Sequence, residues 1–241
     1  MRDVSKDGPS DGLCCPSFKT RPCGSFLRMR QSVEAGLRRI DPGVSRETLG
    51  RLETMVETLL RWQKAINLVA RASLDDIWDR HILDSAQIAP LIPAEAKALV
   101  DLGSGAGFPG LVLAALRPEL DITLIEADVR KSAYLGEAAR RMGLPKQPKL
   151  VVSRIEAAPP AKADVVTARA LAPLGQLLAW ADRQRGNPAI CLFHKGKDWQ
   201  VELTEAMKNW EIEFTPQASV TDSDAVILRI GPYRAKDLRD R

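Results

Sequence analysis

The sequence predicts an α/β protein, in which a mostly parallel sheet flanked by helices follows an N-terminal helical cap. Two observations predict this fold. After residue 93, short β-branched runs alternate with segments of helical periodicity, as is typical of βαβ units. Before residue 93, apolar residues recur at three- and four-residue spacing, which indicates helices. A glycine-rich loop after the first predicted strand then places a ligand site at the carboxyl edge of the sheet.

The same patterns divide the chain into four parts. Residues 1–30 are rich in Gly, Pro, Ser and charge and lack the apolar stretch of a signal peptide, so a disordered extension is expected. Residues 31–93 form the predicted cap, where Ser45 and Glu47 mark a helix start and a second helical stretch covers 74–90. Residues 94–233 form the predicted sheet domain, and residues 234–241 form a charged tail.

Within the sheet domain, strands and helices alternate up to residue 210. The predicted strands are 98–102, 122–126, 150–153, 164–168 and 189–194, and the predicted helices are 110–116, 129–142, 174–184 and 198–210. Two last runs, 211–216 and 225–230, have no helix between them. They therefore predict an antiparallel pair of strands at one edge of the sheet.

Composition excludes several classes of protein. The net charge is +4, but residues 32–233 carry 25 basic and 26 acidic side chains, so the basic excess lies in the two tails and does not predict a nucleic-acid partner. No apolar run is long enough to cross a membrane. The four cysteines (Cys14, Cys15, Cys23 and Cys191) form no CxxC pair, which predicts neither a metal site nor a disulfide scaffold and is typical of a cytoplasmic protein.

The loop from Asp101 to Gly110 (DLGSGAGFPG) predicts a nucleotide-type cofactor. Gly103 and Gly105 let the backbone approach a ligand without Cβ clashes, and the following helix points its N–H groups at the loop. Glu126 ends the second strand, where a carboxylate accepts the hydroxyl protons of an adenosine ribose.

Two cofactors fit this loop. Residues 105–110 also satisfy the GxGxxG pattern of NAD-binding oxidoreductases. Asp101 precedes the glycines, where an acidic group near a cation favours the sulfonium of S-adenosylmethionine, and the terminal antiparallel strands favour a methyltransferase as well. A methyltransferase acting on some other substrate and an NAD-binding oxidoreductase remain the alternatives.

Several motifs together resemble one family, the small-subunit ribosomal RNA methyltransferase G, also called glucose-inhibited division protein B. The resemblance covers roughly residues 50–232 and rests on six segments: Asn67–Leu68, Arg80–Ser85 (RHILDS), the glycine loop, Ser153–Glu156 (SRIE), Ala168–Ala170 (ARA) and His194–Gly196 (HKG). His194 departs from the family, where an apolar residue is commoner. Glu126 stands where the family more often has Asp.

The resemblance implies the Rossmann-like, seven-stranded sheet of class I S-adenosylmethionine-dependent methyltransferases with an N-terminal helical cap. It implies methylation of N7 of a guanosine in the 530 loop of 16S rRNA. Carried over by residue, Gly103 and Phe108 line the cofactor, Ile155 and Glu156 hold the adenine, and Arg169 faces the cofactor.

The residues after the fourth strand fit that reaction. Methyltransferases of exocyclic amines often carry Asn/Asp-Pro-Pro-aromatic there, whereas this chain has Thr167–Leu171 (TARAL). Because guanine N7 already exposes a lone pair, no general base is expected and no residue is assigned a catalytic role.

Three residues are candidates for contact with the rRNA. Arg169 could reach the guanine edge or a phosphate, Lys195 a phosphate, and His81 the RNA or the methionine end of the cofactor. The expected partner is 16S rRNA within a small-subunit particle, bound by a monomer that uses neither metal nor membrane.

Overall fold

The computed structural model describes residues 34–236. The predicted extension (residues 1–30), three of the four cysteines and the last five residues of the predicted tail lie outside these residues. Seven strands form one mixed sheet, in the order β3-β2-β1-β4-β5-β7-β6. Their bounds are β1 (Ala98–Leu102), β2 (Asp121–Glu126), β3 (Lys149–Val152), β4 (Ala163–Arg169), β5 (Arg185–Lys195), β6 (Trp210–Ala218) and β7 (Val226–Ala235).

The direction of the strands confirms the predicted α/β class. The five strands from β3 to β5 run parallel, β7 pairs antiparallel with β5, and β6 pairs antiparallel with β7. The predicted terminal pair is therefore present, but β6 forms the edge and β7 lies inside the sheet. β7 extends into the predicted tail, since Arg234 and Ala235 pair with β6.

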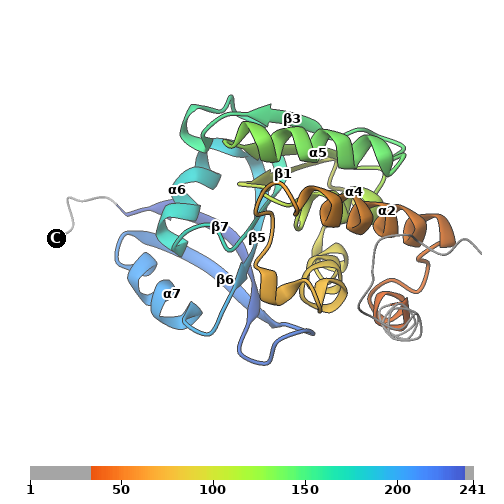
Figure 1. Ribbon diagram of the computed structural model, residues 1–241. Helices are drawn as coiled ribbons and strands as arrows, with labels where there is room; N and C mark the ends of the chain where they lie inside the picture. The colour runs from red at the N-terminus through yellow and green to blue at the C-terminus, as the bar shows by residue number, and fades with distance from the viewer. Residues whose placement is uncertain (1–33, 237–241) are drawn as a thin grey trace, which may run out of the picture.

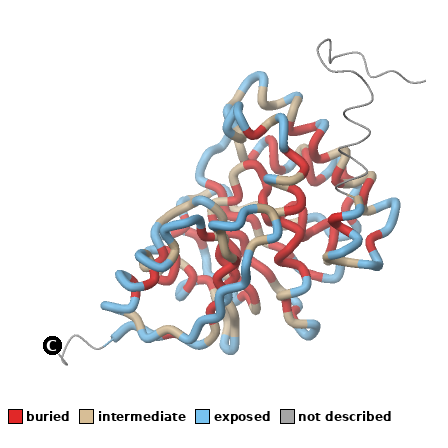
Figure 2. Tube along the Cα trace, turned by 90° about the horizontal axis from the view of Figure 1, so that it is seen from below, coloured by how far each residue is buried: buried red, intermediate tan, exposed pale blue. Residues whose placement is uncertain are grey.

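Helices cover both faces of the sheet (Figure 1). On one face lie α2 (Arg46–Trp62), α4 (Gly110–Leu116) and α5 (Val129–Arg141), and on the other lie α6 (Leu174–Gln184) and α7 (Trp199–Met207). Each face has its own apolar core, and Figure 2 shows the buried residues gathered along the middle of the molecule. The sheet thus separates two cores while its edge stays open to a ligand.

The cap is helical, as predicted, but only its first part is regular. A helical turn at 34–40 precedes α2, whose N-cap Ser45 accepts the Thr48 amide at 3.0 Å, a contact that contributes about 1 kcal/mol. The predicted second helix breaks into shorter segments. These are the 3₁₀ turn η1 (Arg71–Ser73), the π-helical segment η2 (Trp78–Leu83), α3 (Asp84–Ala86) and the 3₁₀ turn η3 (Ala89–Leu91).

The break has a functional consequence. A π-helical turn is wider than an α-helical one and is frequent at functional sites. Here it presents His81 and the adjoining Asp84 to the carboxyl ends of β4 and β5, where both side chains form hydrogen bonds described below. Trp78 and Ile82 on the same segment are buried in the core.

Candidate functional site

A cavity of about 460 Å³ lies at the carboxyl ends of β1, β2 and β4. This volume is within the usual range for small-molecule sites. Seven of the eight residues predicted to contact a cofactor line it: Gly103, Gly105, Phe108, Glu126, Ile155, Glu156 and Arg169. Segments far apart in the sequence therefore meet at one place, which is the ligand position expected for an open α/β sheet.

The glycine loop approaches the cavity closely at its glycines, where there is no Cβ. Gly103 has φ +60°, and a Cβ there would lie 2.5 Å from Cδ1 of Leu171. Farther along, a Cβ on Gly110 would lie 2.7 Å from Oδ2 of Asp101. Neither position accepts alanine without movement of its neighbours. Packing therefore requires glycine at both positions, and at Gly103 the backbone conformation requires it as well.

Glu126 holds the loop in place from the end of β2. Its carboxylate accepts the amide of Gly105 at 2.8 Å through Oε2 and the amide of Asp128 at 2.8 Å through Oε1. Each oxygen of a carboxylate accepts more than one hydrogen bond. The remaining lone pairs are thus able to accept two ribose hydroxyls, which is the role predicted for this residue.

Asp101 is the one predicted cofactor residue that does not line the cavity. Its side chain is fully buried behind the glycine loop, where Oδ1 accepts the hydroxyl of Thr167 at 2.8 Å. Oδ2 has no hydrogen-bond partner within residues 34–236. Burial raises the pKa of Asp101 from 3.8 to about 6, despite the hydrogen bond from Thr167. The sequence correctly located this acid next to the loop, but its side chain is buried behind the loop and does not line the cavity.

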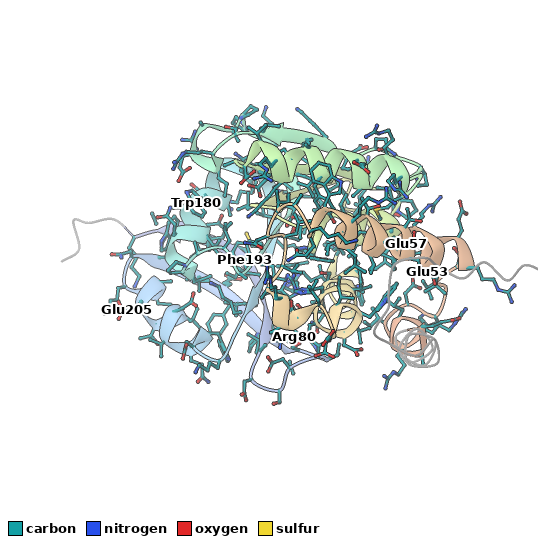
Figure 3. All side chains as sticks on the ribbon, in the orientation of Figure 1. Glu53, Glu57, Arg80, Trp180, Phe193 and Glu205 are labelled. Atoms are coloured by element: carbon teal, nitrogen blue, oxygen red, sulfur yellow. The ribbon has the colours of Figure 1, made fainter. Side chains whose placement is uncertain are left out.

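The side of the cavity predicted to hold adenine contains a contact that the sequence did not reveal. Ile155 is buried in the 3₁₀ turn η4 (Ile155–Ala157), and Glu156 beside it accepts the indole N–H of Trp180 at 3.0 Å. Trp180, labelled on α6 in Figure 3, also lines the cavity. Its sequence position indicated only a helix, because nothing in the periodicity of α6 pairs it with residue 156.

Arg169 reaches the cavity from the end of β4, but its partners lie in the cap. One guanidinium nitrogen donates to the carbonyl of Arg80 at 3.0 Å and to Oδ2 of Asp84 at 3.1 Å. The other donates to Nδ1 of His81 at 2.7 Å. Figure 3 labels Arg80 on the cap segment that lies beside the sheet. Burial lowers the pKa of Arg169, and the charge of Asp84 opposes that effect.

Phe108 links the glycine loop to these cap residues. The His81 ring stacks on it, with ring centroids 5.0 Å apart and an interplanar angle of 16°. The guanidinium carbon of Arg169 lies 5.1 Å from the centroid of the same Phe108 ring. His81 itself is not among the residues that line the cavity. The structure thus places His81 one layer behind the surface that would face a ligand.

Asp84, which the sequence presented only as part of the segment Arg80–Ser85, is the centre of a polar cluster. Its Oδ1 accepts Gln87 at 2.8 Å and Thr221 at 3.0 Å, and its backbone carbonyl accepts Nε2 of His194 at 2.9 Å. His194 is the register partner of Arg169 on the adjacent strand. Burial lowers the pKa of His194, and the nearby Asp84 carboxylate opposes this. Three elements therefore converge on one cap aspartate.

Lys195 lies away from the cavity. Its ammonium group donates to Glu202 at 2.6 Å and to the carbonyl of Ala172 at 2.8 Å, and the residue is 7% exposed. The same Glu202 oxygen accepts the amide of Leu174 at the start of α6. The sequence predicted Lys195 as a phosphate contact. In this structure α7 supplies the carboxylate that its ammonium group binds, and the residue is buried.

Within residues 34–236, no three His, Cys, Asp or Glu side chains are grouped to hold a metal ion. No helix in that part of the chain has the length and apolarity to cross a membrane.

Comparison with known proteins gives a consistent result. The family model for rRNA small subunit methyltransferase G matches residues 48–228. A Ribosomal RNA small subunit methyltransferase G from Paramagnetospirillum magneticum is 49% identical over 188 residues, which cover 78% of this chain and 90% of the relative. One from Rhodospirillum centenum is 50% identical over 198 residues, covering 82% and 90%.

Solved structures agree on the fold. A putative O-methyltransferase from Klebsiella pneumoniae superposes with a TM-score of 0.52 at 14% identity, covering 84% of this chain and 99% of that one. A ribosomal protein L11 methylase from Lactobacillus delbrueckii gives a TM-score of 0.51 at 14% identity, with 63% and 78% covered. The architecture is therefore that of class I S-adenosylmethionine-dependent methyltransferases, as predicted.

Proposed function

We propose that this chain, which belongs to the rRNA small subunit methyltransferase G family, methylates N7 of a guanosine in the 530 loop of 16S rRNA, with S-adenosylmethionine as methyl donor. Membership of a methyltransferase family favours methyl transfer over the hydride transfer that the glycine loop alone left open. The cavity is of suitable size, and Glu126 provides the acceptor that an adenosine ribose requires.

One observation carries the choice of N7. The end of β4 presents Arg169, Ala170 and Leu171 to the cavity, and none of these side chains accepts a proton from a nucleophile. An exocyclic amine needs acceptors for its hydrogens, whereas guanine N7 already has a free lone pair. The residues at this edge therefore suit N7 better than an amine.

The two carboxylates that line the cavity already accept hydrogen bonds from other groups of the chain. Glu126 accepts two backbone amides, and Glu156 accepts the Trp180 indole. Neither stands at the end of β4, where the target guanine is expected to lie. No residue is therefore assigned as a general base, and the rate should show no steep pH dependence that belongs to one side chain.

S-adenosylmethionine supplies a methyl group that the adjoining sulfonium makes electrophilic. The residues of this chain supply position and desolvation. Glu126 orients the ribose, Ile155 offers an apolar surface to the adenine, and Arg169 borders the part of the cavity nearest the cap. Since positive charge moves from donor to base during transfer, a strong electrostatic term from the protein is not required.

The substrate is proposed to be rRNA within a small-subunit particle, bound by a monomer. The region between the tails has no basic excess, so recognition of a structured particle suits it better than binding of any RNA by charge. Methylation of small subunits should accordingly be much faster than methylation of a short naked hairpin. Equal rates on the two substrates would contradict this part of the proposal.

The central test is to map N7-methylguanosine in 16S rRNA from cells with and without the gene. The modification should be absent without the gene and restored by the wild-type chain. Glu126→Ala should fail to restore it, because the loop amide and the ribose acceptor are lost together. Glu57→Ala, an exposed position on α2, is the matched control and should restore it fully. A modification that persists without the gene would refute the proposed function.

A further inference from the structure

We infer that His81 is a positioning residue, which holds the guanidinium of Arg169 at the cofactor cavity and does not itself bind substrate. This inference rests on the proposed function, because it assigns a role within the same site. It replaces the direct contact with RNA or cofactor that the sequence suggested for His81. The geometry of Arg169, the hydrogen bonds of the His81 ring and the packing of that ring each support it.

Three acceptors in the cap fix the position of the Arg169 guanidinium. The Arg169 side chain is 16% exposed, and its guanidinium donates to three acceptors: the carbonyl of Arg80, the carboxylate of Asp84 and Nδ1 of His81. All three acceptors lie between residues 80 and 84 of the cap. An arginine fork binds well only where the acceptors match its fixed geometry. The cap, and not the strand that bears Arg169, therefore sets where its charge lies.

The hydrogen bonds of the His81 ring define which of its nitrogens carries the proton. Arginine only donates hydrogen bonds, so Nδ1 of His81, 2.7 Å from the Arg169 guanidinium, must be the unprotonated acceptor. The proton of the neutral ring then lies on Nε2, which donates to Oγ of Ser73 at 2.9 Å. The Ser73 hydroxyl in turn donates to the carbonyl of Ala70 at 2.8 Å. Both ring nitrogens are thus used, and neither is available for a base or a phosphate.

The His81 ring is also held by packing against Phe108. One face of the His81 ring stacks on Phe108, which lines the cavity, and Arg169 lies against the same Phe108 ring. Burial, followed by the charge of Arg169, lowers the pKa of His81 from 6.5 to about 4, with Asp84 opposing and Arg80 adding to the decrease. At neutral pH the ring is therefore uncharged, as acceptance of a hydrogen bond from Arg169 requires.

Two substitutions separate the hydrogen bond from the packing. His81→Phe keeps an aromatic ring on Phe108 but removes the acceptor. His81→Asn places a side-chain oxygen close to the position of Nδ1. We expect His81→Phe to raise the Kd for S-adenosylmethionine about tenfold, equal to about 1.4 kcal/mol, with the melting temperature nearly unchanged. His81→Asn should lie within about threefold of wild type, because one charge-assisted hydrogen bond is restored.

A double-mutant cycle with Arg169→Met tests whether His81 acts through Arg169. If it does, His81→Phe should change the Kd by less than about twofold once Arg169 is absent, since the two effects are coupled. Additive effects would overturn the inference. So would a His81→Phe variant that binds the cofactor normally but loses binding to small subunits, because that result would make His81 a substrate contact.

A measurement without cofactor keeps this inference separate from the proposed function. Long-range ¹H–¹⁵N NMR correlation reports which ring nitrogen of His81 carries the proton. The Nε2–H tautomer is expected at pH 7, and an Nδ1–H tautomer or a charged ring would overturn the inference. Failure of the wild-type chain to bind S-adenosylmethionine would instead refute the proposed function, while the tautomer would still decide the role of His81.

Discussion

The two sides of the cavity are held by different kinds of contact. The loop side, Gly103–Gly110 with Glu126, is held through backbone groups. The carboxylate of Glu126 accepts the amide of Gly105, which lies 21 residues earlier in the loop after the adjacent strand. The cap side, Arg169 with His81 and Asp84, is built from side chains that are 85 to 88 residues apart. The loop side depends on side chains being absent, whereas the cap side depends on their geometry.

This difference has an energetic consequence. A side chain added to a glycine of the loop side meets packed atoms. At Gly103 it also requires a backbone conformation that L-residues rarely adopt, so there is little room for adjustment. The cap side distributes its contacts over the Arg80 carbonyl, His81 and Asp84, and losing one leaves the others in place. We therefore expect substitutions on the loop side to abolish binding and substitutions on the cap side to weaken it by degrees.

The largest effect on cofactor binding is expected from Gly103→Ala. The added Cβ would lie 2.5 Å from Leu171 at a φ of +60°, so S-adenosylmethionine affinity should fall by at least about 100-fold, with about 1–2 kcal/mol lost from the unfolding free energy. Calorimetric titration and urea denaturation measure the two effects. Gly143→Ala, with the same φ of +60° but no atom within 4 Å, controls for strain alone and should bind the cofactor normally.

Asp84→Asn tests the cap side and should rank second. Removing one charge leaves Arg169 partly buried without its anion, which should cost about 3 kcal/mol of unfolding free energy and weaken cofactor binding. Asp121→Asn removes an ion pair with Lys146 in which the aspartate side chain is 73% exposed, and should cost less than about 1 kcal/mol. Equal losses in the two variants would show that the polar cluster around Asp84 contributes nothing special.

His194→Leu should have a smaller effect. It removes the hydrogen bond to the Asp84 carbonyl, but that carbonyl keeps a contact from Gln87 at 3.0 Å. Because only this one hydrogen bond is lost, we expect a loss of about 1 kcal/mol in denaturation and an unchanged cofactor Kd. A loss exceeding that of Asp84→Asn would mean that β5, and not the Asp84 carboxylate, holds the cap side together.

The smallest expected effect is the pH dependence between pH 4 and 6, because two groups oppose each other. His81, with a folded pKa of about 4 against 6.5 when unfolded, makes unfolding easier as pH falls through this range. Asp101, with a folded pKa of about 6 against 3.8, makes unfolding harder over the same range. His194, whose pKa is also lowered, adds to the effect of His81.

Asp101→Asn should reveal this cancellation. Without the Asp101 titration, the unfolding free energy should fall more steeply with decreasing pH, by up to about 1.4 kcal/mol per pH unit relative to wild type. Urea denaturation at pH 4.5, 5.5 and 7 measures the slope. Parallel slopes in the two proteins would mean that Asp101 does not carry the raised pKa. The loop side would then contribute nothing to the pH dependence of the unfolding free energy in this range.

Local patterns predicted most of the fold. The strand and helix positions from residue 98 onward differ from the observed ones by a few residues, since alternation of β-branched runs with helical periodicity records which face of each element is buried. The loop side of the site was predictable for the same reason. Gly103 and Gly105 follow a buried strand directly, and Glu126 ends the next one.

Other features of the site depend on tertiary packing. Lys195 and Asp101 were placed at the correct ends of their strands, but the sequence does not say which neighbour their charged groups meet. Glu202 comes from α7 and Thr167 from an adjacent strand, and only packing brings them close. The π-helical segment η2 was likewise not predicted, since Trp78–Leu83 contains no Gly or Pro, and its contacts with β4 and β5 join segments far apart in the sequence.

By itself, then, the sequence determined the α/β class, the position of the cofactor loop and the acid that supports it, because those depend on burial periodicity and on residues adjacent along the chain. The tertiary structure alone decided that Arg169 is held by the cap and that His81 uses both ring nitrogens. It also decided that Asp84 joins three elements. Hydrogen bonds between side chains depend on separations of a few tenths of an ångström across distant segments, and no local pattern encodes them.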